Sequence, residues 1–336
     1  MKTILVFGAT GTVGAYTCIY LKERGYNVIA VGHRKTDNGF FALHGMSYYS
    51  VDVCNNDEFY QLPTEGIDSI VHLAGILPAR MKGYNPQKYI DVNVTGTLNI
   101  LLYAKRIGVS SFVYSQSIAD VAHLCGSKTP IPSDVETSFP LNNDHSVYSI
   151  TKTAAVNLIK HYAEIVGFKY YILRFPNIYL YHPNPMYYLD GVEKWQGYRR
   201  LIHMAQCGEH ITVWGDPNKV RDIVYVKDCC QIIEKGIISN ADSGTYNVGT
   251  GIGTTMIEQV EKIVEVFSRQ NKKSSISIDR SKPDTTEYIL DISKTKEKLG
   301  YIPKYDYDAY LLDFKKEMKN ETFKLLWGEN QDKIEL

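Results

Sequence analysis

The sequence predicts an α/β protein built on a doubly wound parallel sheet. Short apolar or β-branched runs alternate with helix-like stretches through the first half of the chain, as they do in successive βαβ units. These runs are almost continuously hydrophobic, which is typical of strands covered by helices on both faces. After residue 178 the pattern breaks into an irregular excursion and then a smaller C-terminal α/β lobe. We expect this lobe to lie over the carboxyl edge of the sheet, where open α/β sheets bind ligands.

The elements can be assigned in chain order. The strands of the expected sheet cover residues 3–8, 27–32, 46–53, 69–75, 111–117 and 169–175. The clearest helices cover residues 14–25, 93–108, 149–167 and 198–208. The main domain then comprises residues 1–178 with about 221–248, and the substrate lobe comprises residues 179–220 and 249–322. Residues 323–336 are polar, and we expect them to form a peripheral tail.

Composition excludes several classes of protein. The 336 residues include 37 basic and 37 acidic side chains, so the chain has no excess charge with which to bind a nucleic acid. No apolar run approaches the ~20 residues that a membrane span needs. The six cysteines show neither metal-ligand nor disulfide spacing. We therefore expect no metal site and a cytoplasmic protein with reduced thiols.

The first motif is the glycine-rich turn "VFGATGTVGAY" at residues 6–16. The expected first strand ends at Gly8, and Gly11 and Gly14 follow at three-residue steps into a helix. Glycines let the turn close and let the backbone approach a pyrophosphate, which the positive end of the helix attracts. In this position the motif predicts a Rossmann-type dinucleotide site, and a purely structural turn is the alternative.

The turn after the second expected strand bears on the choice between NAD and NADP. NAD sites usually have an acidic residue there for the ribose hydroxyls, whereas this chain has His33, Arg34 and Lys35 after Gly32. A guanidinium at Arg34 could pair with a 2′-phosphate, so the sequence favours NADP over NAD. A solvated basic turn is the alternative. Asp52, after the third strand, is expected to reach the adenine edge.

The stretch "YSITK" places Tyr148 four residues before Lys152 in an expected helix, so the two side chains share one face. A phenol is a poor base at neutral pH, but a nearby ammonium and a positively charged nicotinamide both favour the phenolate and lower its pKa. Ser117 ends the preceding strand and could hydrogen-bond the same reacting oxygen. These residues predict an acid–base site for a substrate hydroxyl.

Together the motifs resemble those of the extended short-chain dehydrogenases/reductases. The resemblance is to the UDP-glucose 4-epimerase-like group of sugar-nucleotide epimerases and dehydratases. It is carried by "GATGTVG", "HLAG", "DVNVTGTLNIL", "SQS", "YSITK", "RFPNIY" and "VRDIVYVKD", and runs from residue 3 to about residue 303. So many motifs in order are far more specific than one glycine turn.

The resemblance implies a catalytic set of Ser117, Tyr148 and Lys152, with Lys152 also holding the nicotinamide ribose. It implies that Ser117, Asn177 and Arg221 contact a nucleotide-sugar substrate, the last two at its diphosphate. A salt bridge from Arg221 to a neighbour such as Asp222 is the alternative. A homodimer is also expected, through the helices at 93–108 and 149–167. The residues expected to contact the cofactor lie at turns and strand ends: Gly8, Thr10, Gly11, Thr12, Val13, Gly14, His33, Arg34, Asp52, Val53, Leu73, Ala74, Gly75, Ser115, Tyr148, Lys152 and Phe175.

Some positions depart from the pattern of this group. Ile118 and Ala119 stand where the sugar 4,6-dehydratases have an Asp-Glu pair, and eliminating water needs that acid and base. We therefore expect the chain not to be a 4,6-dehydratase. Arg280 lies one place from the position where relatives often have an arginine, so it is not assigned to phosphate binding. Core packing is the expected role of Trp214.

Three functions remain open. The first is an NAD(P)-dependent epimerase that takes a hydride from a sugar ring carbon and returns it to the other face. An NADPH-dependent keto-reductase of nucleotide sugars would use the same site, and the basic turn at residues 33–35 favours it. The third is a non-catalytic, cofactor-binding regulatory protein, which the intact Tyr148 and Lys152 argue against.

Overall fold

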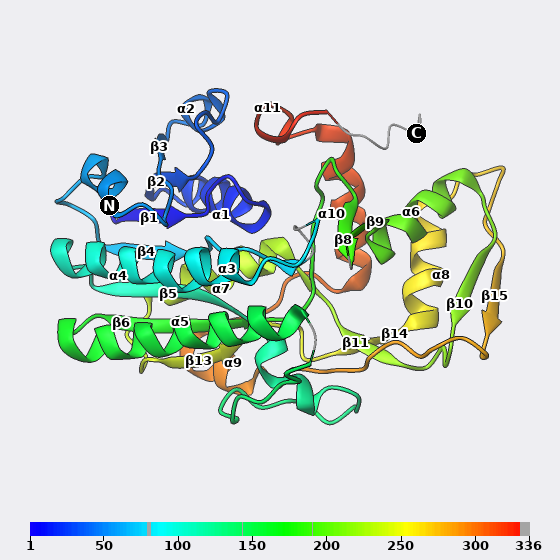
Figure 1. Ribbon diagram of the computed structural model, residues 1–336. Coiled ribbons are helices and arrows are strands. Elements are labelled where there is room, and N and C mark those ends of the chain that lie inside the picture. Colours follow the sequence, from blue (N-terminus) through cyan, green and yellow to red (C-terminus); the bar gives the residue numbers. More distant parts are fainter. Residues whose placement is uncertain (79–81, 143, 190, 330–336) are drawn as a thin grey trace.

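The computed structural model describes residues 1–78, 82–142, 144–189 and 191–329. Its centre is a seven-stranded parallel sheet in the order β13-β6-β5-β4-β1-β2-β3 (Figure 1). The strands are β1 (Thr3–Phe7), β2 (Asn27–Gly32), β3 (Ser47–Ser50), β4 (Ser69–His72), β5 (Ser111–Ser117), β6 (Lys169–Phe175) and β13 (Gly244–Asn247). The predicted doubly wound parallel sheet is confirmed.

Helices cover both faces of this sheet. α4 (Gly96–Ile107) and α5 (Asp144–Val166) lie on one face, and α1 (Thr12–Glu23) and α7 (Val226–Ile238) pack together on the other (Figure 1). Alternate side chains of each strand enter different cores. Phe112 and Ile172 join the cluster beneath α4 and α5, whereas Val113 and Tyr171 join the cluster beneath α1 and α7. Along β5, even-numbered side chains thus point toward α5.

The lobe is built from short strands and three longer helices. Its helices are α6 (Gly197–Cys207), α8 (Met256–Phe267) and α10 (Tyr307–Asn320). The strands outside the central sheet are β7 (Ile178–Tyr179), β8 (Met186–Leu189), β9 (Val192–Trp195), β10 (Ile211–Trp214), β11 (Val220–Asp222), β12 (Val224–Tyr225), β14 (Gly253–Thr255) and β15 (Ile276–Asp279). The sequence indicated only an irregular excursion where β8 and β9 form an antiparallel hairpin, because each strand is only four residues long and prolines precede the first.

Shorter elements complete the chain. They are α2 (Phe40–Leu43), η1 (Asn56–Gln61), α3 (Pro86–Tyr89), η3 (Ile90–Thr95), η4 (Ile118–Leu124), α9 (Ser293–Leu299) and α11 (Lys324–Trp327). In the described part of the chain, every helix is too short or too polar to cross a membrane.

The start of the expected peripheral tail lies inside the fold. Phe323 and Leu326 are only 3% and 2% exposed, since they pack against residues from the N-terminal third of the chain. The structure differs from the expectation at these positions, because the apolar side chains of Phe323, Leu326 and Trp327 pack against the main core. Their polar neighbours in the sequence made this segment look peripheral. Residues 330–336 of that tail lie outside the described residues. The rest of the domain division stays a proposal.

Candidate active site

The glycine turn joins β1 to α1 with no space for larger side chains. Gly8 has a φ of +84°, and a Cβ there would lie 2.6 Å from the backbone nitrogen of Ala74. A Cβ on Gly14 would lie 2.1 Å from the Gly8 carbonyl oxygen. No side chain caps the start of α1 at Gly11, and its first turn has no acidic residue. The N–H groups of that turn are therefore free to bind an anion, as a pyrophosphate site requires.

Residues near the end of β2 border the same turn, and β3 lies next to β2 in the sheet. His33 and Arg34 are exposed, and the Arg34 Nη1 donates a hydrogen bond to the Leu326 carbonyl oxygen at 2.7 Å. Asp52 is also exposed. The Val53 carbonyl accepts a 2.8 Å hydrogen bond from the Asn99 side chain, so α4 fixes the loop that carries Asp52 and Val53. Asn99 is not among the site residues predicted from the sequence.

The turn after β4 completes this border. Leu73 and Ala74 are half-buried and Gly75 is exposed. The buried Asn93 side chain accepts a 2.9 Å hydrogen bond from the Ile76 N–H and lies 3.2 Å from the Thr151 hydroxyl. Asn93 thereby ties the turn to α5. It lies in the π-helical turn η3, and such turns are common at functional sites.

Tyr148 and Ser117 meet at the carboxyl edge of the sheet. Tyr148 is 7% exposed, and burial raises the pKa of its phenol to about 12, although hydrogen bonding to Ser117 works in the opposite direction. The charge of Asp120 adds to the increase. The sequence predicted a lowered pKa for Tyr148. That expectation was for a phenol beside a positively charged nicotinamide, so it stays a prediction. Without the dinucleotide, burial is the largest influence on the pKa of the phenol.

Lys152 points toward the end of β5. Its Nζ donates a hydrogen bond to the Ser115 carbonyl oxygen and lies 4.0 Å from the centre of the Tyr114 ring. Burial lowers the pKa of Lys152 to about 7, and the carboxylate of Asp120 only partly opposes this shift. The ammonium is thus held beside the strand ends, where the resemblance places the nicotinamide ribose.

A chain of contacts joins the catalytic residues to the glycine turn. The Ser115 hydroxyl donates to the His72 carbonyl oxygen at 3.5 Å, and burial together with the charge of Lys152 holds the pKa of His72 well below its usual range. Ala74, two residues after β4, lies against Gly8. The predicted catalytic and cofactor-binding residues therefore share one edge of the sheet. Phe175 belongs to it as well, since it is the register partner of Ser117.

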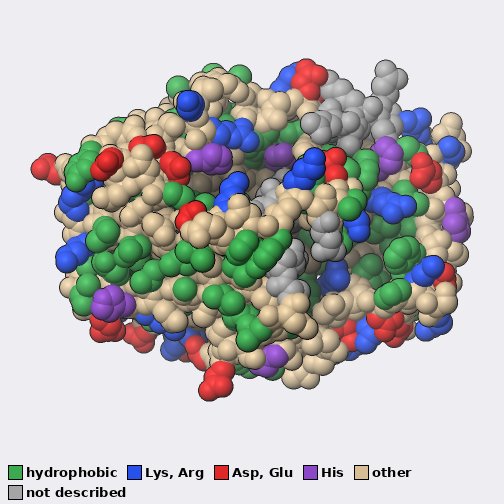
Figure 2. Space-filling model, viewed as in Figure 1, with side chains coloured by type: hydrophobic (Ala, Val, Ile, Leu, Met, Phe, Trp, Pro, Cys, Tyr) green, Lys and Arg blue, Asp and Glu red, His purple; other side chains and the backbone are tan. Residues whose placement is uncertain are grey.

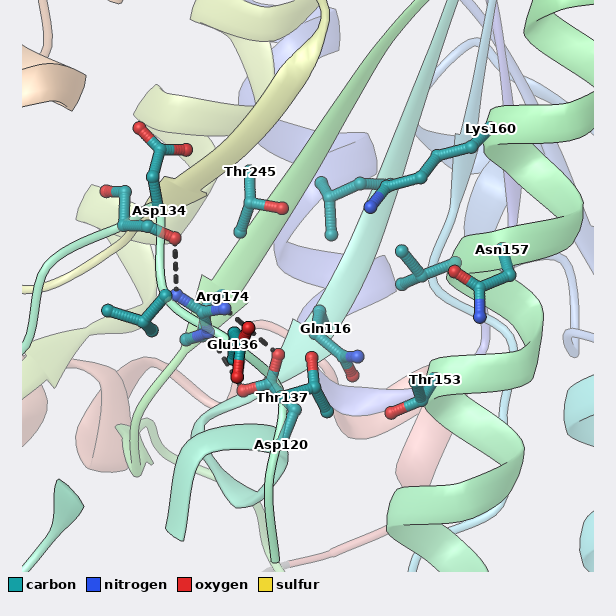
Figure 3. A pocket seen from close by; sticks show the side chains of 14 residues that line it. Gln116, Asp120, Asp134, Glu136, Thr137, Thr153, Asn157, Lys160, Arg174 and Thr245 are labelled. Atoms are coloured by element: carbon teal, nitrogen blue, oxygen red, sulfur yellow. Dashed lines mark hydrogen bonds and ion pairs between the residues drawn. The ribbon is translucent and has the colours of Figure 1, made fainter. Parts of the chain in front are cut away.

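A buried ion pair lies close to Ser117 in the sequence, at Asp120, and is linked to the next strand through Arg174. The Arg174 guanidinium contacts both carboxylate oxygens of Asp120, at 2.8 and 3.1 Å, and each residue is at most 4% exposed. The Gln116 side chain accepts a 2.8 Å hydrogen bond from the Ser117 N–H. All three line a cavity of about 320 Å³ that is closed on one side by Thr153 and Asn157 of α5 (Figure 3). The sequence did not identify this pair, because residues 54 positions apart have no joint local pattern.

The expected diphosphate ligands lie where β6 and β11 lead into the lobe. Asn177 is exposed and Arg221 is half-buried. The strands that follow them, β7 and β12, pair in parallel. The Arg221 Nε donates to the Thr286 carbonyl oxygen at 3.1 Å, whereas Asp222 is fully buried and accepts the N–H groups of Thr250, Gly251 and Leu290. The alternative of an Arg221–Asp222 salt bridge is wrong.

Two further residues of the lobe differ in their surroundings. Trp214 is 57% exposed at the end of β10, so the expectation that it packs in the core is wrong. The pairing of β10 with β15 buries Ile211 and Val213 and leaves the ring of Trp214 outside. Arg280 lies 3.8 Å from Asp216 at an exposed position.

Comparison with known proteins assigns a family to this arrangement. The family model described as "NAD dependent epimerase/dehydratase family" matches residues 4–249. The chain is 26% identical to UDP-glucuronate 4-epimerase of Thermodesulfobacterium geofontis, over 90% of this chain and 92% of that protein. It is 30% identical to UDP-glucuronic acid decarboxylase 1 of Arabidopsis thaliana, over 90% of this chain and 66% of that protein.

A solved structure agrees in fold. UDP-glucuronic acid 4-epimerase from Bacillus cereus, in complex with NAD, aligns with a TM-score of 0.72 at 19% identity. The alignment covers 96% of this chain and all of the other. At this identity the likeness concerns the arrangement of helices and strands.

Proposed function

Because this chain belongs to the NAD-dependent epimerase/dehydratase family, we propose that it epimerises a nucleotide-activated sugar by hydride transfer at a ring carbon. One observation carries the proposal. The buried phenol of Tyr148 meets Ser117 at the carboxyl edge of the sheet. Contacts through Lys152, Ser115 and β4 connect that edge to the glycine turn.

The residues divide the chemistry among them. A bound nicotinamide dinucleotide would supply the hydride acceptor, which later returns the hydride to the sugar. The Tyr148 oxygen takes the proton of the sugar hydroxyl and gives it back in the second half-reaction. The Ser117 hydroxyl hydrogen-bonds the same sugar oxygen. Burial favours the protonated phenol. We propose that Lys152, when protonated, favours the phenolate as the proton is taken up and returned.

We propose NAD rather than NADP as the cofactor. The sequence favoured NADP because of the basic turn at residues 33–35, yet the structural relative from Bacillus cereus was solved with NAD. In this chain the Arg34 guanidinium already donates to the Leu326 carbonyl. Epimerisation regenerates its cofactor, so a reduced NADPH pool is not needed.

Other reactions of the family are less well supported. The exclusion of a 4,6-dehydratase rests on Ile118 and Ala119, which cannot act as acid or base. The nearest carboxylate in that segment, Asp120, is buried and paired with Arg174, so it is not free to protonate a leaving hydroxyl. Decarboxylation of a sugar acid begins with the same hydride step, and keto-reduction uses the same acid–base set.

Product analysis distinguishes these reactions. The purified chain is incubated with NAD and either UDP-glucose or UDP-glucuronate, and the products are separated by chromatography with mass detection. Our proposal predicts an isomer of unchanged mass without net NADH. Loss of CO₂ would indicate a decarboxylase, loss of water a dehydratase, and NADPH consumption with a keto-sugar a reductase. A chain that binds cofactor but turns over none of these substrates would favour the regulatory alternative.

We also propose a homodimer formed through α4 and α5. Figure 2 shows hydrophobic side chains spread over the face that these helices form. They include Leu102 of α4 and Ile150 and Ile165 of α5, which are 41%, 46% and 55% exposed. Charged substitutions Leu102→Lys and Ile165→Lys should convert a dimer to a monomer in light scattering. The six free thiols suit our proposal of a cytoplasmic location.

A further inference from the structure

The segment Phe323–Gly328, here termed the C-terminal strap, packs against the nucleotide-binding part of the main domain. Its helix α11 lies above α1 in Figure 1. The Phe323 ring lies 4.4 Å from the ring of Tyr16 and 5.6 Å from that of Phe40, centre to centre. Phe323 and Leu326 are almost fully buried. The strap is therefore a fixed part of this surface.

Three hydrogen bonds join the strap to two turns of the main domain. The Trp327 Nε1 donates to the carbonyl oxygen of Thr10 in the glycine turn at 3.0 Å. After β2, the Arg34 side chain donates to the Leu326 carbonyl at 2.7 Å. The Asn38 side chain donates to the Leu325 carbonyl at 3.1 Å. The last carbonyls of a helix have no partner within it, so Arg34 and Asn38 satisfy groups that α11 leaves open.

These contacts lie around the position that decides between NAD and NADP. Thr10 packs against the end of β2, since a Cβ on Gly32 would lie 2.7 Å from the Thr10 hydroxyl oxygen. In dinucleotide-binding sheets the residues after the second strand contact the adenosine ribose, and an arginine there accommodates a 2′-phosphate. Arg34 occupies that place in the sequence, and within the described ranges no carboxylate pairs with it.

We propose that the strap is a cofactor-selectivity element, in which the Leu326 carbonyl holds the Arg34 guanidinium away from the 2′-phosphate of NADP. The inference rests on the proposed use of a nicotinamide dinucleotide. A bidentate fork to the phosphate from both terminal nitrogens of Arg34 would take Nη1 from the Leu326 carbonyl, which would then lose this donor. NAD, with a 2′-hydroxyl, leaves this bond intact. A basic turn is in this way compatible with a preference for NAD.

The test compares dissociation constants for NAD⁺ and NADP⁺, measured by isothermal titration calorimetry. A chain ending at Thr322 lacks the strap, and we expect its affinity for NADP⁺ relative to NAD⁺ to rise about tenfold. The milder double variant Asn38→Ala/Trp327→Phe removes two of the three hydrogen bonds but keeps Arg34. It should change the ratio in the same direction by about threefold.

The matched control is Arg34→Ala in the shortened chain, which should abolish the gain. An unchanged ratio in both strap variants would overturn the proposal, as would a gain that persists without Arg34. If circular dichroism shows that the shortened chain is unfolded, the double variant decides. If the unaltered chain binds neither dinucleotide, the proposed function fails. If it binds NAD⁺ but the strap variants leave the ratio of NADP⁺ to NAD⁺ affinity unchanged, only the strap proposal fails.

Discussion

The catalytic residues and the expected diphosphate ligands differ most in their exposure to water. Tyr148 and Lys152 are 7% and 5% exposed. Burial raises the pKa of Tyr148 and lowers that of Lys152, so it favours the neutral form of both side chains. Asn177 is exposed and Arg221 is half-buried. Burial thus affects protonation at the catalytic residues. At the expected diphosphate ligands, Arg221 would act through its charge and Asn177 through hydrogen bonds. Substitutions should therefore change rate, stability and pH dependence at the catalytic residues, and affinity at the expected diphosphate ligands.

The largest expected effect is on turnover. Tyr148→Phe removes the group that exchanges the sugar proton, so kcat should fall by about 10³-fold or more, while the dissociation constant of NAD stays unchanged. Steady-state rates on the sugar that the unaltered chain epimerises, together with calorimetric binding of NAD, measure both quantities. A variant that keeps more than a tenth of the activity would contradict the assignment of Tyr148.

The next largest effect is on the stability of the fold, through the buried ion pair of Arg174 and Asp120. Arg174→Met leaves the Asp120 carboxylate buried without its partner, and the free energy of unfolding should fall by about 3–5 kcal/mol. Urea denaturation measures this change. Arg221→Met is the matched control, since it removes an arginine that has no carboxylate partner among the described residues, and it should cost less than about 1 kcal/mol. Adding Asp120→Asn to Arg174→Met should restore part of the loss.

Lys152 should make stability depend on pH. Its pKa falls from the usual 10.5 to about 7 on folding, so between these values the unfolded chain carries the extra proton. Raising the pH from 7 toward 9.5 should therefore stabilise the folded chain relative to Lys152→Met, by up to a few kcal/mol. The raised pKa of Tyr148 changes stability mainly above pH 10, so it adds little to the pH dependence between pH 7 and 9.5. If the free energy of unfolding changes equally with pH in the unaltered chain and in Lys152→Met, the pKa of Lys152 is not lowered on folding.

The smallest effect is expected at the proposed diphosphate site. Arg221→Lys keeps the charge but loses the planar fork that matches a phosphate, so KM for the nucleotide sugar should rise about tenfold with kcat nearly unchanged. Initial-rate measurements separate the two constants. A fall in kcat with constant KM would place Arg221 at the reacting sugar instead of the diphosphate.

Much of the fold was predictable because its signals are local. Continuous apolar runs, glycines at fixed steps and the four-residue spacing of Tyr148 and Lys152 appear within single strands, turns and helices. The hairpin of β8 and β9 and the packing of Phe323 were not predictable in this way. Each depends on partners that no window of neighbouring residues contains.

The sequence by itself determined six of the seven strands of the central sheet, its main helices and the residues at the ends of β1, β4 and β5. Parallel strands bring those ends to one edge, so the site follows from the pattern. Only the tertiary structure decided how these residues behave. It set the direction of the Tyr148 pKa, paired Asp120 with Arg174, and joined Arg34 to a carbonyl 292 residues away. Desolvation and long-range hydrogen bonds arise when distant segments pack, and local sequence patterns do not record them.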